Sequence, residues 1–236
     1  MKVLVWNENR HEKIEPKVTE IYPGGLHGYI AGILRTDDIE VKTATLDDEN
    51  CGINEDVLKE TDVLIWWGHM CHGEVPDEVV DLVQKYVLEG MGLILLHSAH
   101  HSKIFKRLMG TTCNLKWRDC ARERIWTIKP NHPIAQGVDE TFVIDPEEMY
   151  GEPLDIPNPD EIIFMGWFNG GEVFRSGCTW TRGHGKIFYF QPGHETNRAF
   201  HNKNVQTIIK NAVRWACPLK KNIEIPCPNP EPLENV

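Results

Sequence analysis

The sequence predicts an α/β protein with a mainly parallel sheet between two layers of helices. Two strand-sized segments, Asp62–Trp67 and Leu93–Leu96, are almost entirely apolar, which is typical of strands covered on both faces. Between them, a helix is expected to begin near Pro76, followed by apolar residues at helical spacing: Val79, Val80, Val83 and Val87. Strands that alternate with helices form parallel sheets, because each helix crosses over the sheet to the next strand.

The remaining elements extend this alternation. Further strands are expected at Lys2–Trp6, Glu40–Leu46 and Lys186–Phe190. Helices are expected in the apolar segment that ends at Leu34 and over Ser102–Met109. A closing amphipathic helix follows Asn202, with apolar residues at helical spacing: Val205, Ile208, Ile209, Ala212, Val213 and Ala216.

We expect one domain over residues 1–217. Its middle part, 111–179, is rich in Trp, Pro and Gly and is interpreted as an elaboration on the sheet, because no linker bounds it. Short strands are expected there at Arg124–Lys129, Thr141–Ile144 and Ile162–Gly166. The tail, 218–236, contains five prolines and cannot form a core of its own. We expect it to wrap the body or to reach a neighbouring subunit, which favours a homo-oligomer.

Composition excludes several classes of function. The chain has 236 residues, 25 Lys+Arg and 35 Asp+Glu, and a formal net charge of −10. This acidity opposes non-specific binding to nucleic acid or to an anionic membrane surface. No segment has the length of a membrane span or the pattern of a signal peptide. Seven scattered cysteines without a CxxC pair suit free thiols in a reducing cytoplasm. No phosphate-binding glycine motif is in place, so no nucleotide cofactor is expected.

Histidines follow three of the predicted strands. His69 comes just after Asp62–Trp67, His97 directly after Leu93–Leu96, and His194 shortly after the strand that ends at Phe190. The carboxyl ends of parallel strands meet at one edge of a sheet, and ligands bind there. A fourth histidine, His27, opens the first long helix and is expected to face the same edge.

Two chemical interpretations of His69, His97 and His194 stay open. Neutral imidazoles from separate strands can hold Zn²⁺ or another divalent metal with an open position for water or substrate. Alternatively, one histidine acts as a general base and no metal is involved.

Aromatic and charged residues in the second half of the chain are candidates for a sugar site. Trp117, Trp167 and Trp180 are candidate stacking surfaces for the apolar faces of sugars, and Arg182 is a candidate donor to hydroxyls. The segment from Asp145 to Tyr150 is rich in carboxylates; within it, Glu147 is interpreted as part of a solvated turn.

An ordered set of short motifs resembles the ThuA-like (trehalose utilisation) family over about residues 1–217. The motifs are His97-Ser98-Ala99, Trp117, His132-Pro133-Ile134, Glu148-x-Tyr150, Arg182-Gly183-x-Gly185-Lys186, Gly193-His194-Glu195 and Asn211-Ala212-x-x-Trp215-Ala216. The resemblance implies a flavodoxin-like three-layer sandwich similar to class I glutamine amidotransferases.

The comparison with amidotransferases also predicts a lost activity. Their nucleophile is a cysteine on a sharp turn after a buried strand, and here His97 holds that place. His194 and Glu195 lie near the place of their catalytic His and Glu. Imidazole cannot replace a thiolate efficiently in glutamine hydrolysis, so glutaminase activity is predicted to be absent.

The resemblance implies a role in the catabolism of trehalose or a related disaccharide, on a keto-sugar supplied by a partner dehydrogenase. In this hypothesis His97 and His194 are catalytic, and Glu195 orients His194 or acts as a base. Glu148 and Tyr150 contact the substrate, with His27, Trp117 and Arg182 as further binding residues. The alternatives are a non-catalytic sugar-binding or sensing module and an amidase that uses Cys71.

Overall fold

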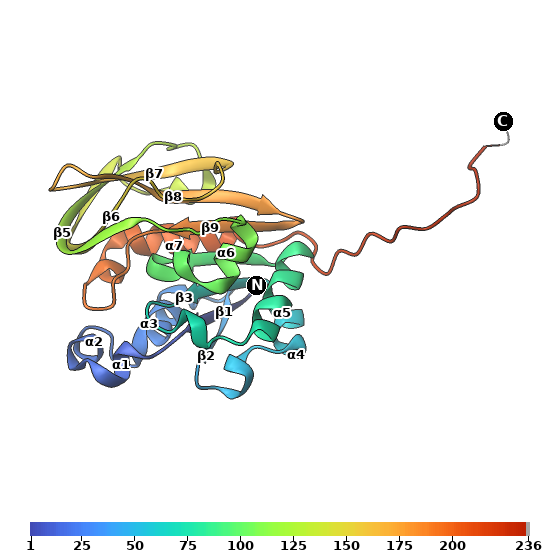
Figure 1. Cartoon of the computed structure of the whole chain (residues 1–236), viewed down its shortest axis with the longest axis horizontal. Coiled ribbons are helices and arrows are strands. Elements are labelled where there is room, and N and C mark those ends of the chain that lie inside the picture. Colours follow the sequence, from blue (N-terminus) through green and yellow to red (C-terminus); the bar gives the residue numbers. More distant parts are fainter. Residues whose placement is uncertain (235–236) are drawn as a thin grey trace.

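A nine-stranded mixed sheet runs through the protein, which the computed structural model describes over residues 1–234 (Figure 1). The strand order is β2-β1-β3-β4-β9-β8-β7-β5-β6. The strands are β1 (Lys2–Asn7), β2 (Glu40–Thr45), β3 (Val63–Trp67), β4 (Gly92–Leu96), β5 (Lys116–Thr127), β6 (Thr141–Gly151), β7 (Glu161–Phe168), β8 (Val173–Arg182) and β9 (Gly185–Phe190).

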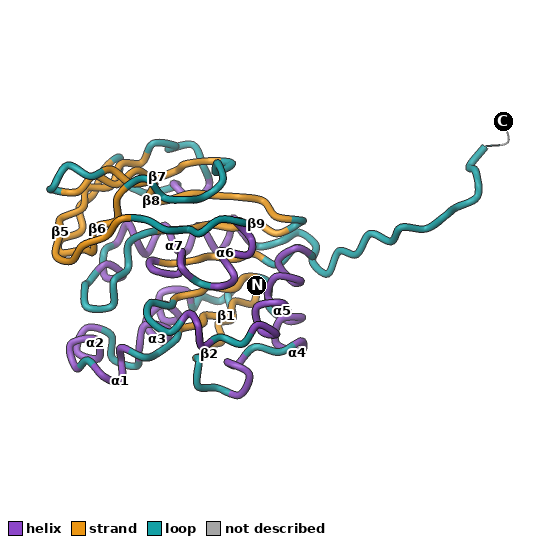
Figure 2. The backbone as a smooth tube through the Cα atoms, in the orientation of Figure 1, coloured by secondary structure: helices purple, strands orange, loops and turns teal. Residues whose placement is uncertain are grey.

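Neighbouring strands from β2 to β9 run parallel, in the order β2-β1-β3-β4-β9. The predicted α/β fold with a large parallel sheet is therefore confirmed. The crossovers from β1 to β2, from β2 to β3 and from β3 to β4 are helical, whereas the connection from β4 to β9 also contains strands β5 to β8 (Figure 2). The helices are α1 (His11–Ile14), α2 (Pro16–Ile21), α3 (Gly25–Leu34), α4 (Glu55–Glu60), α5 (Asp77–Leu88), α6 (Lys103–Met109) and α7 (Lys203–Ala216).

Each face of the parallel half carries its own hydrophobic core. Trp66 of β3 points into a core shared with α4, α5 and α6, whereas Ile65 and Trp67 of the same strand point into a core shared with α3 and α7. Successive side chains of a strand alternate between faces, so a strand buried on both sides must be apolar throughout. This requirement explains the continuous apolar segments that predict the sheet from the sequence.

Residues 116–182 continue the same sheet with four antiparallel strands, β8, β7, β5 and β6. The prediction gave three short strands in this part and none at Val173–Arg182, which forms β8. Ser176 and Gly177 interrupt the apolar pattern there, and Gly177 is required because a Cβ would lie 2.5 Å from the ring of Phe164. Pairing with β7 and β9 stabilises β8, although the sequence of this strand lacks a recognisable strand pattern.

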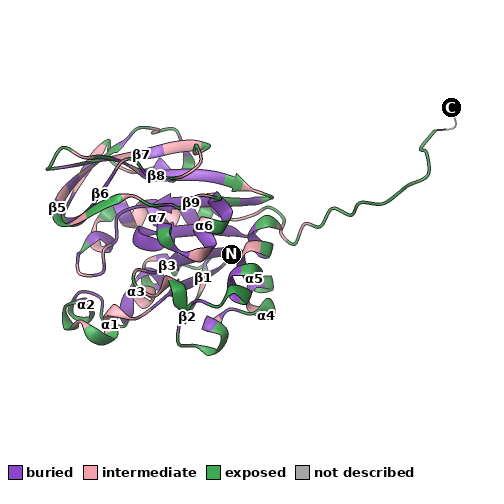
Figure 3. Cartoon of the chain, viewed as in Figure 1, coloured by how far each residue is buried: buried purple, intermediate pink, exposed green. Residues whose placement is uncertain are grey.

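The segment after α7 leaves the body as an extended tail that is exposed from Glu224 to Glu234 (Figures 1 and 3). Its first residues still touch the body: Lys221 pairs with Asp62, and the backbone N–H of Ile223 donates to the carbonyl oxygen of Glu89. Among residues 1–234, no helix is long and apolar enough to cross a membrane.

Candidate functional site

Three histidines meet at the carboxyl edge of the parallel strands. His69 follows β3, His97 follows β4, and His194 follows β9. One ligand atom from each of these residues and one from Glu148 lie within 4.8 Å of one another. The sequence prediction that the strand ends bring His69, His97 and His194 together therefore agrees with the geometry.

Glu148 reaches this group from the other half of the sheet. It belongs to β6, the edge strand at the opposite end of the strand order from β2 and β1. Tyr150 follows two residues later on the same strand. The ring of Tyr150 stacks on that of His97 with 5.2 Å between centroids. The antiparallel half thus curls over the carboxyl edge of the parallel half and supplies one wall of the site.

His97 occupies a sharp turn between β4 and the following 3-10 helix. Its φ is +54°, in the left-handed region that non-glycine residues seldom adopt. A strained strand-to-helix turn of this kind holds one side chain at the top of a sheet, as the nucleophile elbow does in hydrolases. Here the turn presents an imidazole that is fully buried.

Hydrogen bonds fix the rings of His69 and His97. Nδ1 of His97 lies 3.0 Å from the carbonyl oxygen of Gln191 and donates to it. Nδ1 of His69 donates to Oε2 of Glu195 at 2.9 Å. Both rings therefore keep an unprotonated Nε2 when neutral, which is the nitrogen that a metal takes, and the carbonyl and carboxylate partners resemble those of metal-bound histidines.

His194 has the opposite tautomer. The backbone N–H of Thr196 donates to Nδ1 of His194 at 3.2 Å, so this nitrogen is an acceptor. A neutral His194 then carries its proton on Nε2. Two of the three predicted metal ligands are thus arranged to accept a cation, and the third is arranged to donate a hydrogen bond.

A buried carboxylate oxygen of Glu148 faces the histidines without an aligned hydrogen bond. Oε2 of Glu148 lies 3.0 Å from Nε2 of His97, but no aligned hydrogen bond reaches it from residues 1–234. Two ligand atoms of a tetrahedral zinc ion lie roughly 3.3 Å apart, given bonds of 2.0–2.1 Å. The residues present therefore fit a divalent cation held by His69, His97 and Glu148.

The charges of the site follow from burial and close pairing. Burial lowers the pKa of His97, but Glu148 and the neighbouring carboxylates outweigh it and raise that pKa to about 9. Burial raises the pKa of Glu195, but the hydrogen bond from His69 and the nearby histidines lower it to about 2. Burial lowers the pKa of His194 to about 4. At neutral pH and without a bound cation, Glu195 is ionised, His194 is neutral and His97 is protonated, so a metal at Nε2 of His97 would displace a proton.

Glu195 also contacts a residue that the sequence prediction missed. Its Oε1 lies 3.3 Å from Nε2 of His11, in the short helix α1, while its Oε2 accepts from His69. Glu195 therefore orients His69 rather than His194, whose Nδ1 lies 3.7 Å away. His11 lies in a polar segment without strand or helix periodicity, so no pattern indicated it.

The position of Glu147 shows that its interpretation as part of a solvated turn is wrong. Glu147 is fully buried. Its carboxylate accepts hydrogen bonds from the backbone N–H groups of Glu148 at 2.9 Å, Gly193 at 3.1 Å and His194 at 3.2 Å. Burial raises the pKa of Glu147. This side chain fixes the loop that carries His194 and Glu195 against the strand that carries Glu148.

The other predicted binding residues are scattered. Trp117, at the start of β5, lines a cavity of about 290 Å³ beside the site, together with His69, Ser98, His100, Glu148 and Tyr150. His27 instead contacts the side chain of Asn7 at 3.1 Å, and burial lowers its pKa. Trp180 is buried in the core, and Trp167 lies on the outer face of β7.

Arg182 does not belong to the site, contrary to the prediction. It pairs with Gly185 at the start of β9, whereas the histidines lie beyond the end of that strand. Its Nε donates to the carbonyl oxygen of Leu108 at the end of α6. Arg182 therefore lies at the opposite edge of the sheet and anchors a helix.

His100 in the cavity wall makes the stability of the fold depend on pH. Burial lowers its pKa to about 3, and its Nδ1 donates to the carbonyl oxygen of Cys113 at 2.8 Å. Below pH ~6.5 the unfolded chain binds a proton at this residue that the folded chain does not. Each pH unit from there down to the folded pKa costs about 1.4 kcal/mol of folding free energy.

His100→Gln removes this titration and retains a donor. Between pH 7 and pH 5, we expect the variant to lose about 2 kcal/mol less unfolding free energy than the wild type. Urea unfolding at both pH values measures the difference. Equal losses in the two proteins would show that His100 does not titrate as the geometry indicates.

The family profile of ThuA, described as trehalose utilisation, matches residues 2–216. The chain belongs to the ThuA family. A comparison with curated proteins gave no match.

Solved structures similar to this ThuA-family protein include two ThuA-like proteins. That from Parabacteroides merdae is 15% identical, with 96% of this chain and 93% of the other covered and a TM-score of 0.64. That from Bacteroides uniformis is 17% identical, with 92% and 91% covered and a TM-score of 0.66. A cytoplasmic protein from Salmonella typhimurium is 11% identical, with 92% and 100% covered and a TM-score of 0.65. At these identities the likeness concerns the fold.

Proposed function

We propose that the protein is a metal-dependent enzyme of sugar catabolism, located in the cytoplasm, that acts on a keto-sugar derived from trehalose or a related disaccharide. The observation that carries the proposal is the convergence of His69, His97 and Glu148, with His194 beside them. The family's link to trehalose utilisation supports the substrate class. Three protein ligands and an open position are the arrangement of catalytic zinc sites.

Each residue has a distinct role in this proposal. His69 and His97 offer Nε2, and Glu148 offers its buried carboxylate oxygen, to a divalent cation such as Zn²⁺. When bound, such a cation polarises a carbonyl oxygen or lowers the pKa of a bound water. His194 donates a hydrogen bond from Nε2 to a substrate oxygen, and Glu195 holds His69 in its tautomer.

Two hollows flank Glu148 and favour a substrate with two rings. One is the cavity of about 290 Å³, where the exposed ring of Trp117 offers a stacking surface. The other, about 210 Å³, has Lys17, Asp119, His194 and Asn197 among its lining residues. Charged and amide groups of this kind suit the hydroxyls of a second sugar ring.

Glutaminase activity is expected to be absent in this proposal. His97 holds the turn on which a cysteine nucleophile would be required, and it is engaged with Gln191 and Glu148. The nearby thiol of Cys71 is a poor substitute, because burial raises its pKa to about 11.

The test is turnover of trehalose in which one hydroxyl has been oxidised to a ketone, with Zn²⁺ or Mn²⁺ supplied and products followed by NMR. We expect consumption by the wild type and a loss of about 10³-fold in rate for His97→Ala and for His194→Ala. His101→Ala is the matched control, since His101 lines the same cavity outside the cluster. Binding of the keto-sugar without turnover would instead show that the protein is a sugar-binding module. Release of ammonia from glutamine would contradict the proposal.

A further inference from the structure

The outer face of the antiparallel half carries an exposed aromatic surface. Arg124 and Trp126 of β5 lie opposite Trp167 and Met165 of β7, so their side chains share one face of the sheet. Val173 of β8 lies opposite Trp167 and extends the surface by one strand. We call these five residues the tryptophan platform.

The tryptophan platform is shallow, apolar and open to solvent. The side chains of Trp126, Trp167 and Val173 are all more than 40% exposed, although the opposite face of the same strands is buried in the core. The platform lines a hollow of about 470 Å³ in which Arg124 is the charged residue. Grouped apolar exposure of this kind marks a binding surface, because it is costly to leave in water.

A matching apolar segment lies elsewhere in the same chain. Residues 224–234, which we call the proline segment, contain Pro226, Pro228, Pro230 and Pro232 at alternate positions. Each proline fixes its own φ and restricts the residue before it to extended conformations. The whole segment is therefore held near the polyproline II conformation, with three residues per turn.

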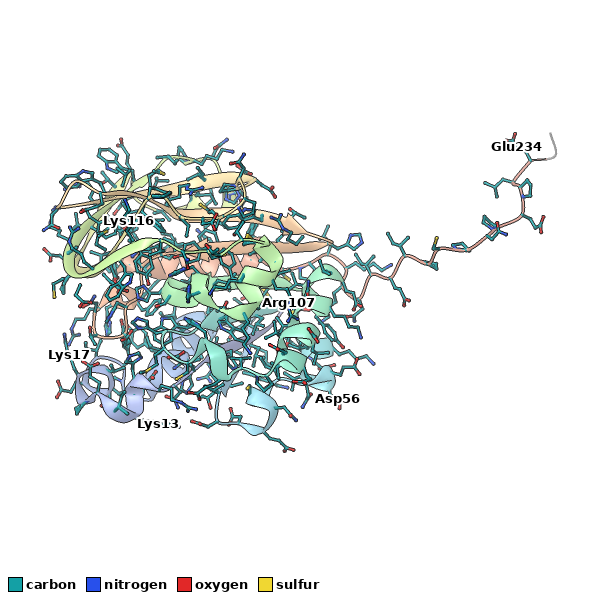
Figure 4. The ribbon with its side chains drawn as sticks, viewed as in Figure 1. Lys13, Lys17, Asp56, Arg107, Lys116 and Glu234 are labelled. Atoms are coloured by element: carbon teal, nitrogen blue, oxygen red, sulfur yellow. The ribbon has the colours of Figure 1, made fainter. Side chains whose placement is uncertain are left out.

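Over residues 227–234, the threefold repeat gives the proline segment an apolar side and a side with two carboxylates. Cys227, Pro230 and Leu233 recur every third residue and share one side, while Pro228, Glu231 and Glu234 share another. Leu233 is fully exposed. From Glu224 to Glu234, no hydrogen bond or ion pair joins the segment to the body, and Glu234 lies far from it (Figure 4).

We propose that the proline segment of one chain docks on the tryptophan platform of a second copy. Polyproline II segments bind aromatic-lined grooves with little loss of conformational entropy, because they are preformed. Pro230 and Leu233 pack between Trp126 and Trp167, and the side with two carboxylates meets Arg124, whose charge is opposite. The tail already points away from its own body, so the pairing is between copies and makes an exchanged-arm dimer (Figure 1).

The test compares the mass per particle of full-length proteins by light scattering. The wild type is expected to be dimeric, and Trp126→Ala with Trp167→Ala monomeric. Ile128→Ala is the matched control, because Ile128 is an exposed apolar residue next to β5 that does not line the hollow. The control is expected to remain dimeric, and equal unfolding midpoints would show that the variants keep their fold.

A peptide with the sequence of residues 222–234 tests the docking directly. We expect saturable binding to a chain that ends at Ile223, and binding about tenfold weaker or worse when both platform tryptophans are replaced. The proposal is overturned if the peptide binds equally well to the platform variant. It is also overturned if the full-length protein is a monomer although the chain that ends at Ile223 binds the peptide. A third contradicting outcome is that binding of trehalose depends on the platform tryptophans and binding of the peptide does not.

Discussion

Protein purified without a histidine tag is expected to contain about one divalent cation per chain, and His97→Ala is expected to contain none. Loss of one of three protein ligands removes most of the affinity of a site that keeps an open position. In His97→Ala, Glu148 also loses the nitrogen that lies 3.0 Å from its Oε2. Elemental analysis of the purified proteins after dialysis measures the content.

His194→Ala separates the role of ligand from that of hydrogen-bond donor. Because Thr196 donates to Nδ1 of His194, we expect this variant to keep most of its cation while it loses turnover. The control is His72→Ala with His101→Ala, which removes two histidines from the same cavity wall but none from the cluster. A wild type that takes up neither Zn²⁺ nor Mn²⁺ on incubation would refute the metal site.

The sequence predicts the edge of the sheet at which the candidate metal ligands meet, because the position of residues after parallel strands depends on the topology alone. Once Asp62–Trp67 and Leu93–Leu96 are recognised as parallel strands, the residues after them must share an edge. His69 and His97 follow from this rule without knowledge of any side-chain contact. The same rule places Arg182 at the opposite edge, because it comes before a predicted strand, so the prediction of Arg182 as a binding residue is inconsistent with the rule.

Contacts between segments far apart in sequence could not be predicted in this way. Glu147 and Glu148 are adjacent in sequence, and only the curl of β6 over the parallel half decides which one faces His97 and which one faces the loop after β9. His11 joins Glu195 across most of the chain, from a helix of four residues. Such pairs depend on tertiary packing, which leaves no periodic signal.

Glu147→Ala is expected to destabilise the fold by about 3–5 kcal/mol, the largest stability effect that we predict. The substitution leaves the backbone N–H groups of Glu148, Gly193 and His194 without their acceptor in a fully buried position. Each buried donor that loses its partner costs roughly 1–3 kcal/mol, and relaxation of the loop recovers part of the sum. Urea unfolding at pH 7 measures the loss.

Glu147→Gln and Glu140→Ala distinguish the role of Glu147 as an acceptor for backbone N–H groups from a general effect of removing a negative charge. Glu147→Gln keeps one carbonyl acceptor but turns an amide donor toward a backbone donor, so we expect an intermediate loss of about 1–3 kcal/mol. Glu140→Ala removes an exposed carboxylate just before the same strand and is expected to change stability by less than about 0.5 kcal/mol. Because Glu147 fixes the loop that carries Glu195, which in turn orients His69, Glu147→Gln should also weaken cation binding. Unchanged stability and unchanged cation content in Glu147→Gln would show that the backbone alone fixes this loop.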